Sequence, residues 1–256
     1  MIESLEYHIA DHCNLNCAGC SHFSPLAKPW LVDPEIFEKE WKEVADSGLE
    51  IRRIRILGGE PLLHPELGFM LKCVRLLFPV SDINVVTNGI LLKKRKEELL
   101  PIFNKYNISI TVSCYPGLGL DYRELLRGFP KVEVYDKTGF WNISLHDKAD
   151  FPKEDFYSCF SGSMAKCNFL KDGRIYPCCV IPNLPHFFKY FEEARVMDLA
   201  KIPLENAGIS VKDHTAEEIE KFLCMPSEFC AHCNVYNAVI PHAWKRTNYD
   251  IKEWME

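Results

Sequence analysis

Three cysteines stand close together near the start of the chain, at Cys13, Cys17 and Cys20. Cysteine thiolates are soft ligands that hold iron-sulfur clusters. Three of them on one short loop can bind three irons of a four-iron cluster, so that the fourth iron stays open to another ligand. The loop therefore predicts a metal centre whose open iron is the reactive position. A structural zinc site or a chance cluster of cysteines is the alternative.

Polar residues also follow three predicted strands. Gly58-Gly59-Glu60-Pro61 comes directly after the strand predicted over 54–57. Its glycines can bring backbone amides and carbonyls close to a ligand, and Glu60 offers a carboxylate to an ammonium group. Thr87 and Asn88 end the next strand, and Ser113 ends the one after it. The Thr87-Asn88-Gly89 turn can equally be stabilised by its own side chains.

Strands and helices alternate through the first half of the chain, as short buried strands and amphipathic segments do in α/β proteins. Asp33 is the predicted N-cap of the first helix, and Pro101 is predicted to interrupt a helix that starts near Leu92. We expect a partial (β/α)6 TIM-like barrel with its polar loops at the carboxyl ends of the strands. The predicted strands span 5–10, 54–57, 83–86, 108–112 and 132–135.

From about Phe140 this alternation fails, and a domain boundary is predicted near Asp150. Residues 1–150 form the partial barrel, and residues 151–256 form a small α+β domain. In the second domain, Asp172-Gly173 predicts a hairpin that places Cys167 opposite Cys178 on one face. A helix is predicted over Thr215–Leu223, with Thr215 and Glu218 forming a capping box.

Composition narrows the function classes. The formal net charge of -6 over 256 residues argues against a nucleic-acid-binding surface. The first twelve residues lack the features of a secretory signal, and no apolar stretch approaches membrane-spanning length. Twelve cysteines in a chain without export features indicate metal binding rather than disulfides, which predicts a cytoplasmic protein.

The CxxxCxxC spacing at Cys13, followed one strand later by Gly58-Gly59-Glu60-Pro61, resembles the motifs of radical S-adenosylmethionine (SAM) enzymes. The resemblance implies a [4Fe-4S] cluster whose open iron binds SAM, and cleavage of SAM to a 5'-deoxyadenosyl radical that takes a hydrogen atom from substrate. It implies that Gly58, Gly59 and Glu60 bind the SAM amino group. Thr87 and Asn88 would meet the ribose, and Ser113 the ribose or carboxylate.

One position departs from this family. The residue before the third cysteine is usually aromatic and packs near the adenine, whereas Gly19 stands here. Another side chain must then cover the adenine, and Phe23 is the candidate.

The second half resembles the auxiliary-cluster module of SPASM/twitch radical SAM enzymes. Gly173-x4-Cys178 lies between Cys159 and the pair Cys230-x-x-Cys233, and the longer cysteine run of a full SPASM module is absent from the sequence. The resemblance implies a twitch module with a second [4Fe-4S] cluster on Cys178, Cys230 and Cys233. The fourth ligand is Cys159 by family spacing or Cys167 by hairpin geometry, and zinc in the same cage is the alternative.

The leading functional hypothesis is the oxidation of a small polar metabolite, because the chain resembles the twitch dehydrogenase of an aminocyclitol alcohol. There the auxiliary cluster can accept the leftover electron, and a reductant such as flavodoxin or ferredoxin would supply the first one. A peptide-modifying maturase is a second hypothesis, although only twelve residues precede Cys13, where such enzymes usually carry a leader-binding domain.

A radical epimerase or decarboxylase is a further option. Cys114, at the end of a strand, could face the cavity and return a hydrogen atom to substrate, and plain packing is its alternative role. The non-enzymatic alternative is an iron-sulfur or zinc protein that carries electrons or binds a partner.

Overall fold

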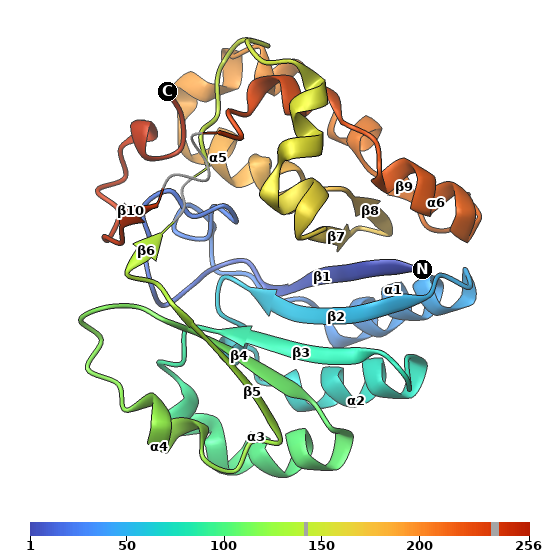
Figure 1. The fold of residues 1–256 in the computed structure, drawn as a ribbon, viewed down its shortest axis with the longest axis vertical. Coiled ribbons are helices and arrows are strands. Elements are labelled where there is room, and N and C mark those ends of the chain that lie inside the picture. The colour runs from blue at the N-terminus through green and yellow to red at the C-terminus, as the bar shows by residue number, and fades with distance from the viewer. Residues whose placement is uncertain (141–142, 237–240) are drawn as a thin grey trace.

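The computed structural model describes residues 1–140, 143–236 and 241–256 (Figure 1). Its first half alternates strands and helices as the sequence predicts. The strands of this half are β1 (Ile2–Ala10), β2 (Ile51–Gly58), β3 (Asp82–Thr87), β4 (Ser109–Cys114) and β5 (Lys131–Asp136). The helices are α1 (Pro34–Asp46), α2 (Leu67–Leu77), α3 (Leu92–Tyr106) and α4 (Tyr122–Leu126).

The second half adds shorter elements. Its strands are β6 (Gly139–Phe140), β7 (Asn168–Lys171), β8 (Arg174–Tyr176), β9 (Ile209–Ser210) and β10 (His242–Ala243), and its helices are α5 (Leu184–Tyr190) and α6 (Ala216–Leu223). Asp172 and Gly173 both have positive φ, 51° and 69°, which is the geometry of a two-residue hairpin turn. Phe169 lies opposite Tyr176, so the predicted hairpin and its register are confirmed.

One mixed sheet joins the two halves, in the order β5-β4-β3-β2-β1-β7-β8-β9. β1 to β5 are parallel neighbours, and β7 pairs in parallel with β1, with Leu5 opposite Asn168. Among the described strands the sheet stays open, as expected of a partial barrel. The hairpin of the second half is therefore a continuation of the first sheet, and the sheet crosses the boundary predicted near residue 150.

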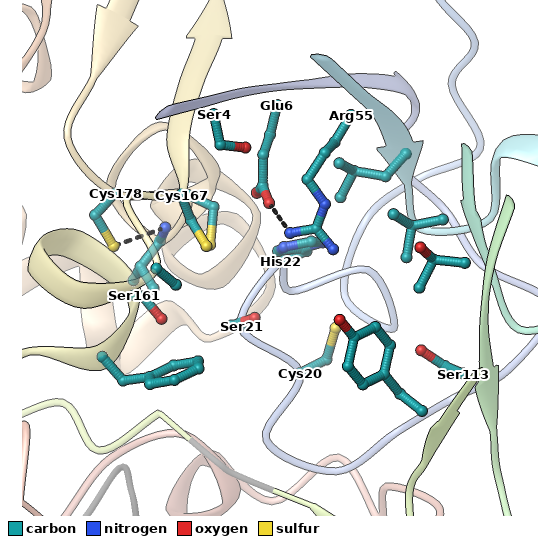
Figure 2. A pocket seen from close by; sticks show the side chains of 18 of the residues that line it. Ser4, Glu6, Cys20, Ser21, His22, Arg55, Ser113, Ser161, Cys167 and Cys178 are labelled. Carbon is teal, nitrogen blue, oxygen red and sulfur yellow. Dashed lines mark hydrogen bonds and ion pairs between the residues drawn. The ribbon is translucent and has the colours of Figure 1, made fainter. Parts of the chain in front are cut away.

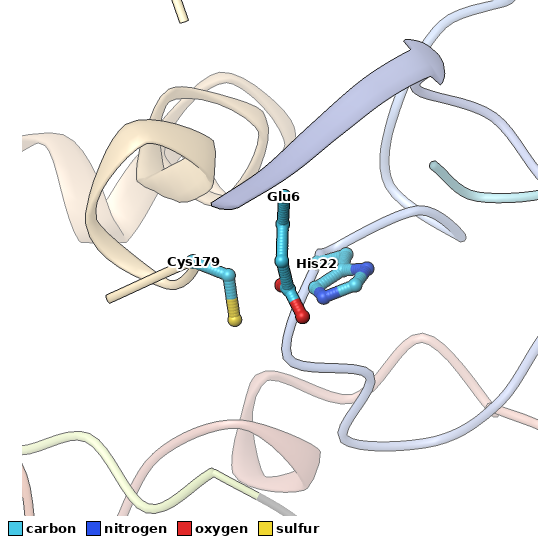
Figure 3. A group of neighbouring side chains, drawn as sticks. All are labelled: Glu6, His22 and Cys179. Carbon is cyan, nitrogen blue, oxygen red and sulfur yellow. The ribbon is translucent and has the colours of Figure 1, made fainter. Parts of the chain in front are cut away.

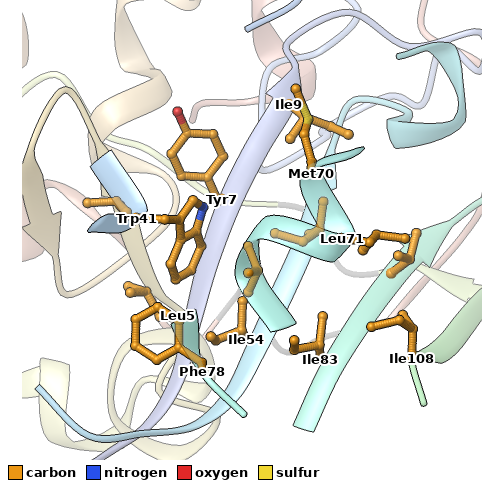
Figure 4. Packing of buried hydrophobic residues seen from close by; sticks show 14 of the residues in the cluster. Leu5, Tyr7, Ile9, Trp41, Ile54, Met70, Leu71, Phe78, Ile83 and Ile108 are labelled. Atoms are coloured by element: carbon orange, nitrogen blue, oxygen red, sulfur yellow. The ribbon is translucent and has the colours of Figure 1, made fainter. Parts of the chain in front are cut away.

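The two faces of the sheet differ in chemistry because side chains alternate along each strand. On β1, Leu5, Tyr7 and Ile9 are buried in a hydrophobic core that includes Trp41 of α1 and residues of α2 and α3 (Figure 4). The intervening Ser4, Glu6 and His8 belong to the opposite face and are buried polar residues. Helices α1 to α4 and α6 thus pack on the apolar face, α5 packs in a second core, and the polar face is left to line a site.

Local signals explain most element ends. Asp33 caps α1 by accepting a hydrogen bond from the Glu35 backbone N–H, and Thr215 and Glu218 form the predicted capping box of α6. The prediction at Pro101 is wrong, because α3 continues through it. Leu99 and Phe103, on either side of Pro101, are fully buried, so core packing keeps the helix continuous. None of the described helices combines the length and apolar composition needed to cross a membrane.

Candidate functional site

The loop that carries Cys13, Cys17 and Cys20 follows β1 and is held by a distant segment. The backbone N–H of Ala18 donates to Lys245, 3.1 Å away, and that of Thr247 donates to Asn16, 3.0 Å away. Donors also reach the sulfurs. The Trp244 indole N–H lies 3.1 Å from Cys17 Sγ, and the Leu15 backbone N–H lies 3.3 Å from Cys13 Sγ.

Burial raises the pKa of all three thiols, that of Cys17 to about 12. Desolvation is the largest cause in each case, and the mutual repulsion of the sulfurs adds to it for Cys13 and Cys17. Three partly or fully buried cysteines whose sulfurs repel one another as thiolates are a donor set whose charge a bound metal centre would neutralise. The loop therefore fits an iron-sulfur cluster ligated at three positions.

Two glycines press the end of β2 against this loop. The Gly59 backbone N–H donates to the Ala10 carbonyl at 2.7 Å. A Cβ on Gly58 would lie 2.2 Å from the Ala10 oxygen, and one on Gly59 would lie 2.2 Å from the His12 oxygen. Both glycines line the same cavity as the three cysteines. Close backbone approach is thus the structural reason for this glycine pair.

The carboxylate of Glu60, expected to contact the SAM amino group, is not among the groups that line the cavity. It is fully buried and caps the turn Pro61–Leu63, accepting a hydrogen bond from the Leu62 backbone N–H at 2.9 Å. It also accepts from Thr87 Oγ1 at 2.7 Å and from the Asn88 backbone N–H at 3.0 Å. Burial raises its pKa to about 7. Glu60 therefore fixes the loop after β3, while the Gly58 and Gly59 backbones face the cavity.

Thr87, Asn88 and Ser113 line the cavity, as the sequence predicts. The predicted self-stabilised turn is confirmed too, since the Gly89 N–H donates to Thr87 Oγ1 and the Ile90 N–H donates to Asn88 Oδ1, both at 3.0 Å. Asn88 also donates through Nδ2 to Asn14 of the cysteine loop at 2.7 Å and to Cys13 Sγ at 3.6 Å. The loop after β3 is thus tied directly to the proposed cluster ligands.

A second group of four sulfurs gathers in the other half, at Cys159, Cys178, Cys230 and Cys233. Burial raises the pKa of Cys233, and the negative charges of Cys178, Cys159 and Cys230 raise it further. The pKa of Cys230 likewise responds to Cys178 and Cys159 after burial. Cys159 is therefore close enough to the other three thiols for their charges to affect one another's ionisation.

Cys167, the other candidate, is affected by the charge of Cys178, but its main neighbours are Glu6 and Arg55. After burial, the charge of Glu6 is the largest cause that raises its pKa, and Arg55 lowers it. It lines the cavity together with Cys179, outside the group of four. Figure 2 shows Cys167 between Cys178 and Glu6. Of the remaining cysteines, Cys224 is exposed, and Cys73 is buried in the helix-side core as predicted.

One cavity of about 1150 Å³ joins the two sulfur groups. Its wall includes the three cysteines of the first loop and Cys159, Cys178 and Cys233 of the second group. Glu6, His22 and Cys179 lie on the wall between them, with ligand atoms within 4.8 Å of one another (Figure 3). Arg55 Nη1 already lies 2.7 Å from Glu6 Oε1, a fixed cation that disfavours a metal ion there.

Residues 7–121 match the family model described as the Radical SAM superfamily. Residues 7–121 therefore form a radical SAM domain. Proteins of this superfamily bind a [4Fe-4S] cluster and SAM, and the site described above fits both.

The relatives of this radical SAM protein include GTP 3',8-cyclases. That of Aquifex aeolicus (strain VF5) is 33% identical over 102 residues, which cover 38% of this chain and 31% of the relative. That of Staphylococcus aureus (strain Mu3 / ATCC 700698) is 31% identical over 228 residues, 85% of this chain and 60% of the relative. The chain thus spans less than two thirds of the length of these relatives.

Solved structures share the fold of this radical SAM protein. The crystal structure of BtrN in complex with AdoMet and 2-DOIA aligns with a TM-score of 0.57 and 17% identity, over 91% of this chain and 93% of that chain. At this identity the likeness concerns the fold.

Two sequence expectations for this radical SAM protein are corrected by the structure. Phe23 is fully buried in the second hydrophobic core, 5.6 Å from the ring of Phe187, so it does not cover an adenine at the cavity. Cys114 is not among the residues that line the cavity, and its sulfur lies 4.0 Å from the Val112 carbonyl oxygen. Ser113 occupies the cavity side, and its neighbour Cys114 packs against the hydrophobic core, because adjacent strand residues point to opposite faces.

The sequence analysis missed Tyr115 and Trp244. Tyr115 lines the cavity, and burial followed by the charge of Cys17 raises its pKa. Its ring lies 5.4 Å from that of Trp244, which donates to Cys17. An aromatic residue two positions after Ser113 was a usable signal for Tyr115, whereas Trp244 lies far away in the sequence. Both rings lie beside the first cysteine loop.

Proposed function

We propose that this radical SAM enzyme oxidises a small polar metabolite by removing a hydrogen atom from carbon, and that a second [4Fe-4S] cluster accepts the remaining electron. The observation that carries the proposal is the single cavity lined by both sulfur groups. When bound, the first cluster and SAM supply a 5'-deoxyadenosyl radical. A substrate held between the two groups meets that radical on one side and an electron acceptor on the other.

Residues of the cysteine loop and of the loops after β2, β3 and β4 would bind different parts of the cluster and SAM. Cys13, Cys17 and Cys20 hold the cluster at three positions, with N–H donors on two of the sulfurs. Gly58 and Gly59 bring backbone carbonyls to the cavity wall, where they can accept from the SAM ammonium group. Thr87, Asn88 and Ser113 offer polar side chains for the ribose or carboxylate. Glu60 acts behind them by fixing the position of the loop after β3.

Cys159, Cys178, Cys230 and Cys233 would hold the second cluster. In the oxidation, the substrate would lose one hydrogen atom from carbon to the adenosyl radical, one proton, and one electron that passes to this second cluster. A reductant such as flavodoxin or ferredoxin supplies the electron that cleaves SAM. The enzyme thus needs electron transfer at both sulfur groups.

Anaerobic reconstitution tests the proposal. The wild type should bind about eight irons per chain, and should form 5'-deoxyadenosine from SAM with dithionite as reductant. Cys17→Ala should abolish 5'-deoxyadenosine formation. Cys233→Ala should retain it but lose about four irons, whereas exposed Cys224→Ala serves as the matched control and should lose neither. If the wild type bound zinc in the second group and only about four irons, the second group could not be an iron-sulfur electron acceptor, and the proposal would be refuted.

A radical epimerase is the second candidate, because Cys167 and Cys179 are thiols on the cavity wall outside the group of four. In that reaction a thiol S–H bond breaks and a substrate C–H bond forms, and the thiyl radical returns to the thiol by taking one electron from the reductant and one proton from solvent. Candidate metabolites are incubated in D2O. Deuterium at a substrate carbon that is lost in Cys167→Ala would establish epimerisation, and an unlabelled oxidised product would establish the dehydrogenase.

A further inference from the structure

Between the two sulfur groups, the polar face of the sheet presents a charged pair. Glu6 of β1 and Arg55 of β2 are direct neighbours in the strand register and lie 2.7 Å apart between Glu6 Oε1 and Arg55 Nη1. Ser4 stands two residues before Glu6 on the same strand. All three side chains line the cavity, and Figure 2 shows them along one wall.

The groups on this wall that still lack hydrogen-bond partners among the described residues are donors on Arg55 and Ser4. Glu6 is only 3% exposed, and its carboxylate is occupied by Arg55 and by the thiol of Cys167. Arg55 has five N–H donors, of which the described contacts use one, and its buried Nε has no partner. Ser4 is 7% exposed, and its Oγ is also buried without a partner. Unused donors in a buried site call for a ligand that supplies acceptors.

A second cation, Lys137, lies close to Arg55 on this wall. Glu6 balances Arg55, but the half-buried Lys137 also lines the cavity close to Arg55, and the described ion pairs give it no carboxylate. Asp136 on the same wall is exposed, and its carboxylate accepts from the Thr138 backbone N–H. Arg53 stands two residues before Arg55 on β2 and is already paired with Asp82 and Glu133. Lys137 is therefore a cation beside the unused donors for which the described contacts include no ion pair.

We propose that Arg55, oriented by Glu6 and assisted by Ser4 and Lys137, binds an anionic group of the substrate, a carboxylate or a phosphate. The inference rests on the proposed function, since it places the substrate in the cavity between the two sulfur groups. A guanidinium with free N–H groups pairs well with the oxygens of either anion. The substrate class is thus narrowed from a polar metabolite to an acidic one.

Equilibrium dialysis of the reconstituted holoenzyme with SAM present tests this, with radiolabelled inorganic phosphate and radiolabelled succinate as separate probes. The wild type should bind about one equivalent of one of them, and the preferred probe identifies the anion. Arg55→Gln should weaken binding at least tenfold, and Arg55→Lys should weaken it less. Arg127→Gln is the matched control, because Arg127 is exposed, pairs with Glu124 and is not among the residues that line the cavity. It should leave binding unchanged.

Absence of binding of both anions, or equal loss in Arg127→Gln and Arg55→Gln, would overturn the proposal. Formation of 5'-deoxyadenosine is measured on the same samples. If it persists while anion binding is absent, the anion site is wrong and the proposed function stands; if the wild type forms none, the proposed function fails first. Lys137→Met should weaken anion binding several-fold and leave SAM binding unchanged. Weaker SAM binding with unchanged anion binding would remove Lys137 from the site.

Discussion

Gly59→Ala tests whether close contact between the end of β2 and the cysteine loop is required. The new Cβ would lie 2.2 Å from the His12 carbonyl oxygen, 2.3 Å from its carbon and 2.7 Å from the Asp11 oxygen. These are backbone atoms of the segment that leads into Cys13, so no side chain can rotate away to make room. The backbone must retreat by about 1 Å to reach ordinary van der Waals distance.

The expected loss of stability is at least about 3 kcal/mol, the upper range for overpacking a closely packed region. For a chain of this size, about 3 kcal/mol corresponds to a fall in Tm of roughly 6–12 °C. The displacement also moves Cys13, so iron binding should fall by about four irons per chain. Gly117→Ala is the control, because its Cβ meets nothing within 4 Å although its φ is +76°.

The assay is a thermal melt of reconstituted protein with iron quantified on the same samples. Gly117→Ala should cost only the backbone strain of a positive φ, about 1–2 kcal/mol, with iron unchanged. A Gly59→Ala variant that melts within 2 °C of the wild type and retains its iron would refute the argument that the two strand ends must touch.

Further predictions concern single groups. Because the folded-state pKa of Glu60 is raised from 4.5 to about 7, its contribution to stability is present below pH 4.5 and is lost as the pH rises to about 7. The difference in unfolding free energy between wild type and Glu60→Gln should therefore shrink by up to about 3 kcal/mol between pH 5 and 8, as measured by thermal melts; a constant difference would contradict it. Pro101→Ala should raise the unfolding free energy by about 1–3 kcal/mol, since it restores a helix donor in α3, and a lower Tm would contradict this. Trp244→Phe removes the N–H donor from Cys17 and should shift the reduction potential of the first cluster, measured by anaerobic redox titration, while Trp30→Phe should not.

The features predicted well from the sequence depend on nearby residues. Asp33 and Thr215 cap helices through residues two or three positions away, and Asp172-Gly173 forms its turn without outside help. The polar loops after β2, β3 and β4 meet because parallel strands end at one edge of a sheet. Cys13 and Thr87 are therefore close by a rule that needs no tertiary detail.

The features predicted poorly depend on which face or which distant segment a residue meets. Glu60 was expected at the ligand, but its carboxylate is surrounded by donors from the loop after β3. Cys114 was expected to face the cavity because it stands at a strand end. Side chains alternate between the two faces, however, and Ser113, one residue earlier, is the one on the cavity side. Phe23 packs against Phe187, and Trp244 donates to Cys17; each contact joins residues more than 150 positions apart in the sequence. The direct pairing of β7 with β1 is likewise a long-range event.

The contact between the first cysteine loop and the far end of the chain has a consequence for biosynthesis. Ala18 and Asn16 bond to residues 245 and 247, and the Trp254 indole donates to the Cys20 carbonyl at 3.0 Å. A nascent chain exposes its three N-terminal sulfurs early, but the backbone and indole groups that enclose them leave the ribosome some 230 residues later. Assembly of the metal centre in its enclosed form is therefore a late event in the life of the polypeptide. Chains cut short before this segment would carry the ligands in an open loop, accessible to oxygen.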